Sequence, residues 1–383
     1  MKNFIPAMAA TLAFSSAPEA LSAPLGEFTQ LSDVGAVSRA SEAAFDKSSG
    51  TYTFGASGDN LWAARDAFGF LWKQSHGDLA LAARIEIQGT SAQGHRKAGL
   101  MFRQTLDADS AYADAVVHGD GLTSLQFRSE RGGPTREVQC AARAPTLLRL
   151  EKRGDYVQLS LGNEDGMFED SGCVIRIALR GAFYAGLLVC AHDDNAFETA
   201  LFKHVILGKP PKRSETPMYA IELLPLGSLD RKVLYRYNLP LDSASFTATG
   251  DALCFRQAGQ LQRLSLTVGA QPELIGAENA AQCEVAHSGL LDSSKTPRDA
   301  GKGGSKAWLT RVSPDGQTLA YLFGGVRAQD GKPGVGDYQL RSVPIAGGEP
   351  RELARLFGGP GALGVAPWSA DGKQLVFVSR EPD

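Results

Sequence analysis

The amino-acid sequence predicts an all-β protein. Apolar and polar residues alternate in short runs, glycine is abundant at 43 of 383 residues, and turn-forming pairs separate the runs. A chain of this length holds two or three domains at the usual ~100–200 residues each. We expect an antiparallel β-sandwich over residues 26–207, a linker over 208–217, and a partial β-propeller over 218–383.

Residues 26–207 contain the alternating runs that predict the sandwich. Each run is short and ends at a glycine or aspartate turn, which is typical of strands joined by hairpins. Runs at this spacing favour two antiparallel sheets packed face to face. The expected strands are Leu79–Gly89, Lys97–Gln104, Ala111–Gly119, Leu122–Glu130, Thr146–Gly154, Tyr156–Gly162, Cys173–Leu179 and Phe183–His192.

A proline-rich linker and an internal repeat define the second half. "GKPPKRSETP" (208–217) holds three prolines and mixed charges, and is typical of a boundary between domains. "TATGDALCFR", "SPDGQTLAYL" and "SADGKQLVFV", starting at Thr247, Ser313 and Ser369, align position for position. Each places a glycine turn before an alternating strand, which indicates propeller blades. Residues 218–383 have room for about four blades of ~40–45 residues. Open sheet edges in so short a propeller predict a homodimer.

The first 22 residues predict a signal peptide. Lys2 precedes the apolar run "FIPAMAATLAF", and Ala20 and Ser22 are small residues before the expected cleavage point. The alternative is the mobile N-terminus of a cytosolic protein. Cleavage implies a periplasmic or secreted protein, and no later segment reaches the ~18 apolar residues of a membrane span.

The cysteine pattern leaves the pairing open. No Cys-x-x-Cys motif occurs, and the chain has five cysteines, Cys140, Cys173, Cys190, Cys254 and Cys283. Some of them pair in an oxidising compartment, and the odd count leaves at least one unpaired. Buried free thiols are the alternative.

Two family resemblances add to this interpretation. The segments 57–72, 77–86, 97–113, 125–133 and 184–205 resemble the concanavalin A-like lectin/glucanase jelly roll, which implies a jelly-roll sandwich whose concave face often binds carbohydrate. "VSPDGQTLAYL" and "PWSADGKQLVFVS" resemble a TolB-type (WD40-like) β-propeller, which implies a scaffold or a surface that contacts an envelope protein. His287 lies where that family has a His-Gly pair, and as the only histidine of this half it argues against a multi-histidine metal site.

One strand face carries the candidate binding residues. Arg103, His118, Gln126 and Arg128 fall on one side of their strands, while apolar or small residues fall on the other. Planar donors beside aromatic rings suit a sugar ligand. The alternative is the solvated outer face of an antiparallel sheet. The predicted ligand-binding residues are Trp62, Phe68, Arg103, Tyr112, His118, Gln126 and Arg128.

Other site chemistry has weaker support. Asp193 and Asp194 in "HDDNAFE" supply oxygen ligands of the kind calcium takes, although an ordinary polar loop explains them as well. No further cofactor is expected. The Glu-x-Asp-x-x-Glu run that the glucanase branch carries is missing, and so are Gly-x-Ser-x-Gly, His-Glu-x-x-His and phosphate-loop motifs. We therefore expect no catalytic residues.

Together these patterns favour a secreted or periplasmic carbohydrate-binding protein, with the glycan on the concave face and the propeller as scaffold. Two alternatives remain open. One is a glycan-active hydrolase or lyase, and the other is an envelope scaffold that binds no sugar. A net charge of −3, from 39 basic and 42 acidic residues, argues against a nucleic-acid partner.

Overall fold

The computed structural model describes residues 25–142, 147–213, 216–239, 241–276, 283, 307–325, 334–359, 361–364 and 367–382. These residues form β-strands and turns and contain no α-helix, which confirms the predicted fold class. Accordingly, the described part holds no helix of the length and apolar character that a membrane crossing requires. The predicted signal peptide (1–22) and His287 lie outside the described residues.

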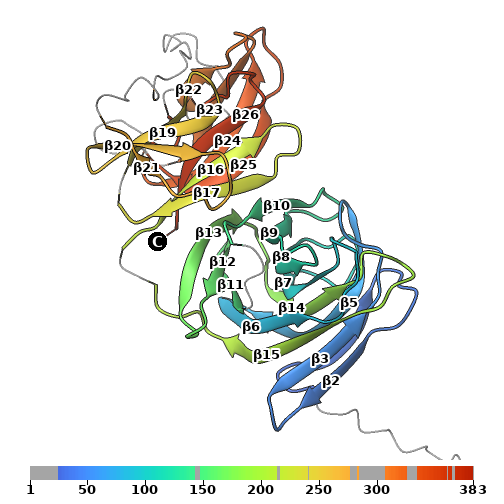
Figure 1. Ribbon diagram of the computed structural model, residues 1–383. Helices are drawn as coiled ribbons and strands as arrows, with labels where there is room; N and C mark the ends of the chain where they lie inside the picture. Colours follow the sequence, from blue (N-terminus) through green and yellow to red (C-terminus); the bar gives the residue numbers. More distant parts are fainter. Residues whose placement is uncertain are drawn as a thin grey trace, which may run out of the picture.

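The largest sheet has eleven strands and runs through both halves of the chain (Figure 1). Its order is β1-β5-β14-β7-β8-β9-β10-β17-β16-β26, and β4 pairs with β5. Its strands are β1 (Gln30–Val34), β4 (Asn60–Trp62), β5 (Arg65–His76), β7 (Lys97–Arg103), β8 (Tyr112–His118), β9 (Thr123–Arg128), β10 (Arg136–Gln139), β14 (Ala182–Cys190), β16 (Tyr219–Pro225), β17 (Arg231–Tyr237) and β26 (Gln374–Arg380).

A seven-stranded sheet packs against the first seven strands of this path and completes an antiparallel sandwich. Its order is β13-β12-β11-β6-β15-β3-β2, with strands β2 (Glu42–Asp46), β3 (Thr51–Ala56), β6 (Leu79–Ile87), β11 (Leu147–Arg153), β12 (Tyr156–Gly162), β13 (Phe168–Arg176) and β15 (Glu198–Gly208). Leu100, Leu150 and Phe202 are among the buried side chains between the two sheets. Removal of this apolar surface from water is the main force that holds the sheets together.

Two four-stranded sheets make up most of the C-terminal half. They are β18 (Leu241–Phe246), β19 (Ala252–Gln257), β20 (Gln260–Ser265) and β21 (Glu273–Leu274), and β22 (Ala307–Val312), β23 (Thr318–Gly324), β24 (Gly336–Pro344) and β25 (Arg351–Gly358). With β16, β17 and β26 they give three blade-like groups of strands within the described residues, so the predicted number of about four blades is not confirmed. A disulfide joins Cys254 to Cys283.

The three repeats fold into the same turn, as the sequence predicts. At the second repeat, Ser313 Oγ donates to Asp315 Oδ1 at 2.5 Å, and Gly316 has a φ of 72°. At the third, Ser369 Oγ donates to Asp371 Oδ1 at 2.6 Å. At the first, Thr247 takes the place of serine and its hydroxyl bonds to Asp251. The short side chain bonds to its own turn, and the glycine supplies the positive φ.

The sandwich and the C-terminal half share a sheet because β10 pairs with β17 in parallel, with Val138 opposite Arg231. Figure 1 shows β10, β13 and β17 where the two halves meet. The exposed edge from which we predicted a homodimer is thus, at β17, paired within the chain. The predicted division into domains at 208–217 separates β15 from β16, but the largest sheet crosses it.

Candidate functional site

The polar side chains that the sequence assigns to one strand face do lie together. β7, β8 and β9 are neighbours, and their register places Tyr112 opposite both Arg103 and Arg128. Leu100 belongs to the core between the sheets, whereas Tyr112 belongs to a separate cluster on the outer side of the first sheet. Because side chains alternate along a strand, the strand parity predicted from the sequence is confirmed.

A segment of the sandwich itself covers this outer side. Leu61 of β4 is buried in the outer cluster beside Phe68. The Asp66 carboxylate accepts hydrogen bonds from Arg128 at 2.8 and 2.6 Å, and lies 3.4 Å from both terminal nitrogens of Arg103. One carboxylate shared by two guanidiniums offsets part of the positive charge that is otherwise unfavourable to bury.

The side chains of this face are buried, which corrects the expectation that the face is exposed. Phe68, Arg103, Tyr112 and Arg128 are each 0% exposed, Gln126 is 1% exposed, and His118 is 4% exposed. Trp62 alone among the predicted binding residues is half-buried. An open ligand groove and a solvated outer face both require exposed side chains, and β4 with its flanking residues removes that exposure. A ligand-binding role for these residues stays a prediction.

A second polar group lies on the same covered face. Lys97 Nζ donates to the Leu61 carbonyl at 3.0 Å and to Gln126 Oε1 at 3.2 Å. His118 Nδ1 lies 3.0 Å from the Leu122 carbonyl oxygen, which assigns the ring proton to Nδ1. Burial, with the positive charge of Lys97 adding to it, lowers the pKa of His118 to about 4. The imidazole is therefore neutral near pH 7.

Three further ionisable residues of this face are not among the predicted binding residues, although strand alternation places Lys97 with Arg103 and Asp114 with His118 on this face. Burial raises the pKa of Asp114 well above its usual range, with Lys97 opposing that shift. Asp66, Lys97 and Asp114 are all nearly inaccessible to solvent. One signal was available for Asp66, which stands in the apolar run "AARDAFGFLW", because an acid in such a run is rarely buried without a partner.

The predicted calcium loop forms an exposed turn. Asp193 Oδ1 accepts a hydrogen bond from the N–H of Asn195 at 2.8 Å, and both Asp193 and Asp194 are exposed. Among the residues that the structure describes, no three His, Cys, Asp or Glu side chains are grouped to hold a metal ion. Calcium binding at this loop stays a prediction.

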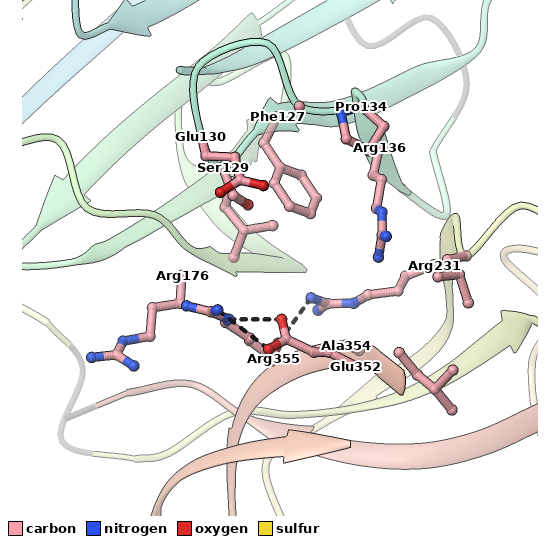
Figure 2. A pocket seen from close by; sticks show the side chains of 14 residues that line it. Phe127, Ser129, Glu130, Pro134, Arg136, Arg176, Arg231, Glu352, Ala354 and Arg355 are labelled. Carbon is pink, nitrogen blue, oxygen red and sulfur yellow. Dashed lines mark hydrogen bonds and ion pairs between the residues drawn. The ribbon is translucent and has the colours of Figure 1, made fainter. Parts of the chain in front are cut away.

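An open cleft of about 300 Å³ lies where the sandwich meets the C-terminal sheets (Figure 2). One wall comes from the end of β9, the loop that follows it and β10, and the other walls come from β13, β17 and β25. The lining residues are Phe127, Ser129, Glu130, Gly133, Pro134, Arg136, Ile175, Arg176, Leu229, Arg231, Glu352, Leu353, Ala354 and Arg355. Nine of the fourteen lining residues belong to strands.

Arg231 of β17 links its own wall to those of β13 and β25, and also bonds to β16 behind the cleft. Its guanidinium donates to the buried Glu222 carboxylate at 2.6 and 3.0 Å, to the Val174 carbonyl at 2.8 Å, and to the Arg355 carbonyl at 3.3 Å. These acceptors come from β16, β13 and β25. Arg231 is thus neutralised and serves the structure of the cleft.

The remaining arginines of the cleft differ in how well they are paired. Arg355 donates to the Glu352 carboxylate at 2.8 and 3.2 Å. Arg176 lies 3.6 Å from Asp155 and 3.8 Å from an Asp337 oxygen. Arg136 makes no side-chain hydrogen bond or ion pair within the described part of the chain, and Figure 2 shows it pointing into the cleft near the Phe127 ring. Among the described arginines that line the cleft, Arg136 is therefore the one whose side chain makes no hydrogen bond or ion pair, although its charge acts on the nearby Asp230 carboxyl.

No protein-family model and no curated protein matches this sequence. Among solved structures, the carbohydrate binding module CBM66 from Bacillus subtilis is 17% identical, over 48% of this chain and 98% of that chain, with a TM-score of 0.33. A functionally unknown protein from Saccharomyces cerevisiae is 14% identical over 45% of this chain and 93% of that chain, with a TM-score of 0.37. A candidate TolB from Agrobacterium tumefaciens is 14% identical over 76% and 100%, with a TM-score of 0.19. These TM-scores are too low to say what this chain does.

Proposed function

We propose that this protein binds an acidic glycan in the cleft between the sandwich and the C-terminal sheets, and does not cleave it. The observation that carries the proposal is Arg136. Its guanidinium points into an open cleft beside an aromatic ring, and within the described residues it forms no ion pair, its nearest recorded acidic neighbour being Asp230, on which its charge acts without direct contact. A guanidinium forms paired hydrogen bonds with a carboxylate or sulfate group, so a charged sugar would complete the site.

The lining favours a sugar over a purely apolar ligand. Phe127 is half-buried, and its ring is turned toward the cleft (Figure 2). The apolar C–H face of a sugar ring packs on such a surface, while its hydroxyl groups bond to the surrounding polar side chains. Ser129 and Glu130 offer further polar groups on the same wall.

The charge balance favours an acidic sugar over a neutral one. Arg231 and Arg355 each have their own carboxylate, from Glu222 and Glu352. Four arginines and two glutamates, Glu130 and Glu352, line the cleft, and the buried Glu222 neutralises one of the arginines. The described lining therefore keeps a small positive excess, which Asp230 near Arg136 and Asp337 near Arg176 reduce. Such a field attracts anions, and its effect weakens as salt concentration rises.

This proposal keeps the ligand class that the sequence favours but moves the site. The binding residues predicted from the sequence lie on the outer side of the first sheet, where β4 covers them, whereas the cleft is open. Glu130 and Glu352 also line the cleft, and paired carboxylates are what a glycoside hydrolase uses, so the test includes a measurement of cleavage.

Calorimetric titration with an oligogalacturonate and with a neutral cello-oligosaccharide of equal length tests the proposal. We expect binding of the acidic sugar only. Arg136→Gln removes a charge-assisted hydrogen bond of about 1.5–3 kcal/mol, which weakens binding by roughly 10- to 150-fold. The matched control is Arg131→Gln, since Arg131 lies in the loop between β9 and β10, is exposed, and does not line the cleft.

Three results would count against the proposal. Equal affinity of the Arg136→Gln variant and the native protein would remove Arg136 from the site. A loss of binding in Trp62→Ala, with Arg136→Gln unaffected, would place the ligand on the concave face instead. Release of new reducing ends during incubation would show that the protein is an enzyme.

A further inference from the structure

Two cysteine thiols meet in the core of the sandwich. Cys140 directly follows β10, and Cys173 lies in β13 of the other sheet. Their sulfur atoms are 2.8 Å apart, and the residues are 2% and 0% exposed. The contact joins side chains from different sheets, so it is set by the fold rather than by the local sequence.

Hydrogen bonds hold both backbones at this contact. The N–H of Cys140 donates to the Thr123 carbonyl at 3.0 Å, and the N–H of Cys173 donates to Ser171 Oγ at 3.0 Å. Ser171 Oγ donates in turn to the Leu159 carbonyl at 2.5 Å. The two thiols therefore face each other from anchored positions.

Within the described residues, no other cysteine competes for either thiol. Cys254 and Cys283 are already joined by a disulfide. Cys190 lies on the outer side of the first sheet, where its thiol is 3.6 Å from the carbonyl oxygens of Gly58 and Ala67. Because side chains on opposite faces of a sheet are separated by the backbone, Cys190 is remote from the Cys140 thiol.

We infer that Cys140 and Cys173 form a disulfide when the chain folds in an oxidising environment, and remain two thiols in a reducing one. The oxidant is a small disulfide such as glutathione disulfide. One cysteine thiolate attacks it and releases a glutathione thiolate, and the second cysteine thiolate then displaces the other. Two electrons pass to glutathione, and the two thiol protons end on the two glutathione thiols.

The exchange belongs to folding, before the core closes. In the folded chain, burial raises the pKa of the Cys140 thiol well above its usual range, and only the thiolate reacts with a disulfide. Burial also keeps reagents away from both sulfur atoms. The redox state set during folding is therefore protected afterwards.

The bond would also link two walls of the cleft. β10 carries Arg136, and β13 carries Ile175 and Arg176. A covalent link between these strands fixes the separation of the walls. The inference itself rests on the cysteine contact alone and does not depend on glycan binding.

The full-length chain is refolded from the reduced state, once with reduced and oxidised glutathione and once with dithiothreitol. Free thiols are alkylated in denaturant, and the peptides are mapped by non-reducing mass spectrometry. The concentration of glutathione disulfide is raised until the peptides of Cys254 and Cys283 are found linked, so that this bond reports complete oxidation. We then expect linked peptides of Cys140 and Cys173, with Cys190 alone alkylated.

Alkylation of both Cys140 and Cys173 under the conditions that link Cys254 to Cys283 would overturn the inference. A linked pair that includes Cys190 would overturn it as well. The native chain suffices for this decision, so it does not depend on whether a cysteine variant folds. Cys190→Ser serves as the matched variant, and it is expected to keep both linked pairs and to leave no alkylated cysteine.

Discussion

Replacement of Asp66 by asparagine tests the buried charge cluster directly. Asp66→Asn keeps the size of the side chain but removes the negative charge between Arg103 and Arg128, all three being 0% exposed. Removal of one partner from a buried ion pair costs about 3–5 kcal/mol, because the other charge stays buried. The guanidiniums keep several carbonyl acceptors, among them those of Thr105 and Ser110, so we expect a loss of about 4 kcal/mol in total.

Urea unfolding followed by circular dichroism measures this loss as a change in the free energy of unfolding. The control is Asp107→Asn, which breaks an ion pair between Asp107 and the exposed Arg131, where about 0–1 kcal/mol is expected. A loss of under about 1 kcal/mol in Asp66→Asn would refute the reasoning, since it would equal that of a surface pair. Adding Arg103→Met should recover part of the loss, because it removes one of the two uncompensated charges.

Two further predictions concern protonation and close packing. The pKa of His118 is about 4 in the folded chain and 6.5 in the unfolded one, so the unfolded state takes up the proton first as pH falls. Stability is therefore lost between about pH 6.5 and about pH 4, by roughly 3 kcal/mol, and His118→Gln should flatten this part of the curve of unfolding free energy against pH. A curve for His118→Gln that is as steep as that of the native protein would show that His118 does not cause this pH dependence. In Gly186→Ala, the new Cβ would stand 2.1 Å from the Leu71 carbonyl oxygen of the paired strand, so we expect a loss of about 1–3 kcal/mol in urea unfolding. Gly208→Ala, where nothing lies within 4 Å of the added Cβ, should have little effect; equal losses in both variants would exclude the steric explanation.

Local rules were sufficient for some features of this protein. Alternation along a strand placed Arg103 and Arg128 on one face, because a period of two residues follows from backbone geometry alone. The repeated turns were predictable because their hydrogen bonds are also local. Ser313 donates a hydrogen bond to Asp315 within the turn, and Gly316 supplies its positive φ, so the turn needs no distant partner.

These local rules do not predict that β4 and its flanking residues cover the predicted face. β4 has only three residues, Asn60–Trp62, and so short a strand leaves too few residues for alternation of apolar and polar side chains to predict it. The ion pair between Asp66 and Arg128 joins residues 62 positions apart, and no periodic pattern records such a contact. The parallel pairing of Val138 with Arg231 has no local signature either. Polar residues on one face therefore predicted the face correctly but not its exposure.

The buried cluster and the open cleft are connected through a single strand. Phe127 and Arg128 are consecutive residues of β9 and point to opposite sides of the sheet, so Arg128 is held by Asp66 while Phe127 lines the cleft. Arg128 also donates hydrogen bonds to the carbonyls of Ala63, which follows β4, and of Gly133, which lines the cleft. The charge cluster thus gives the cleft wall a fixed position, although none of its members reaches the cleft. Arg128, which the sequence assigns to a binding face, thus supports the wall of the cleft in which we propose that the glycan binds.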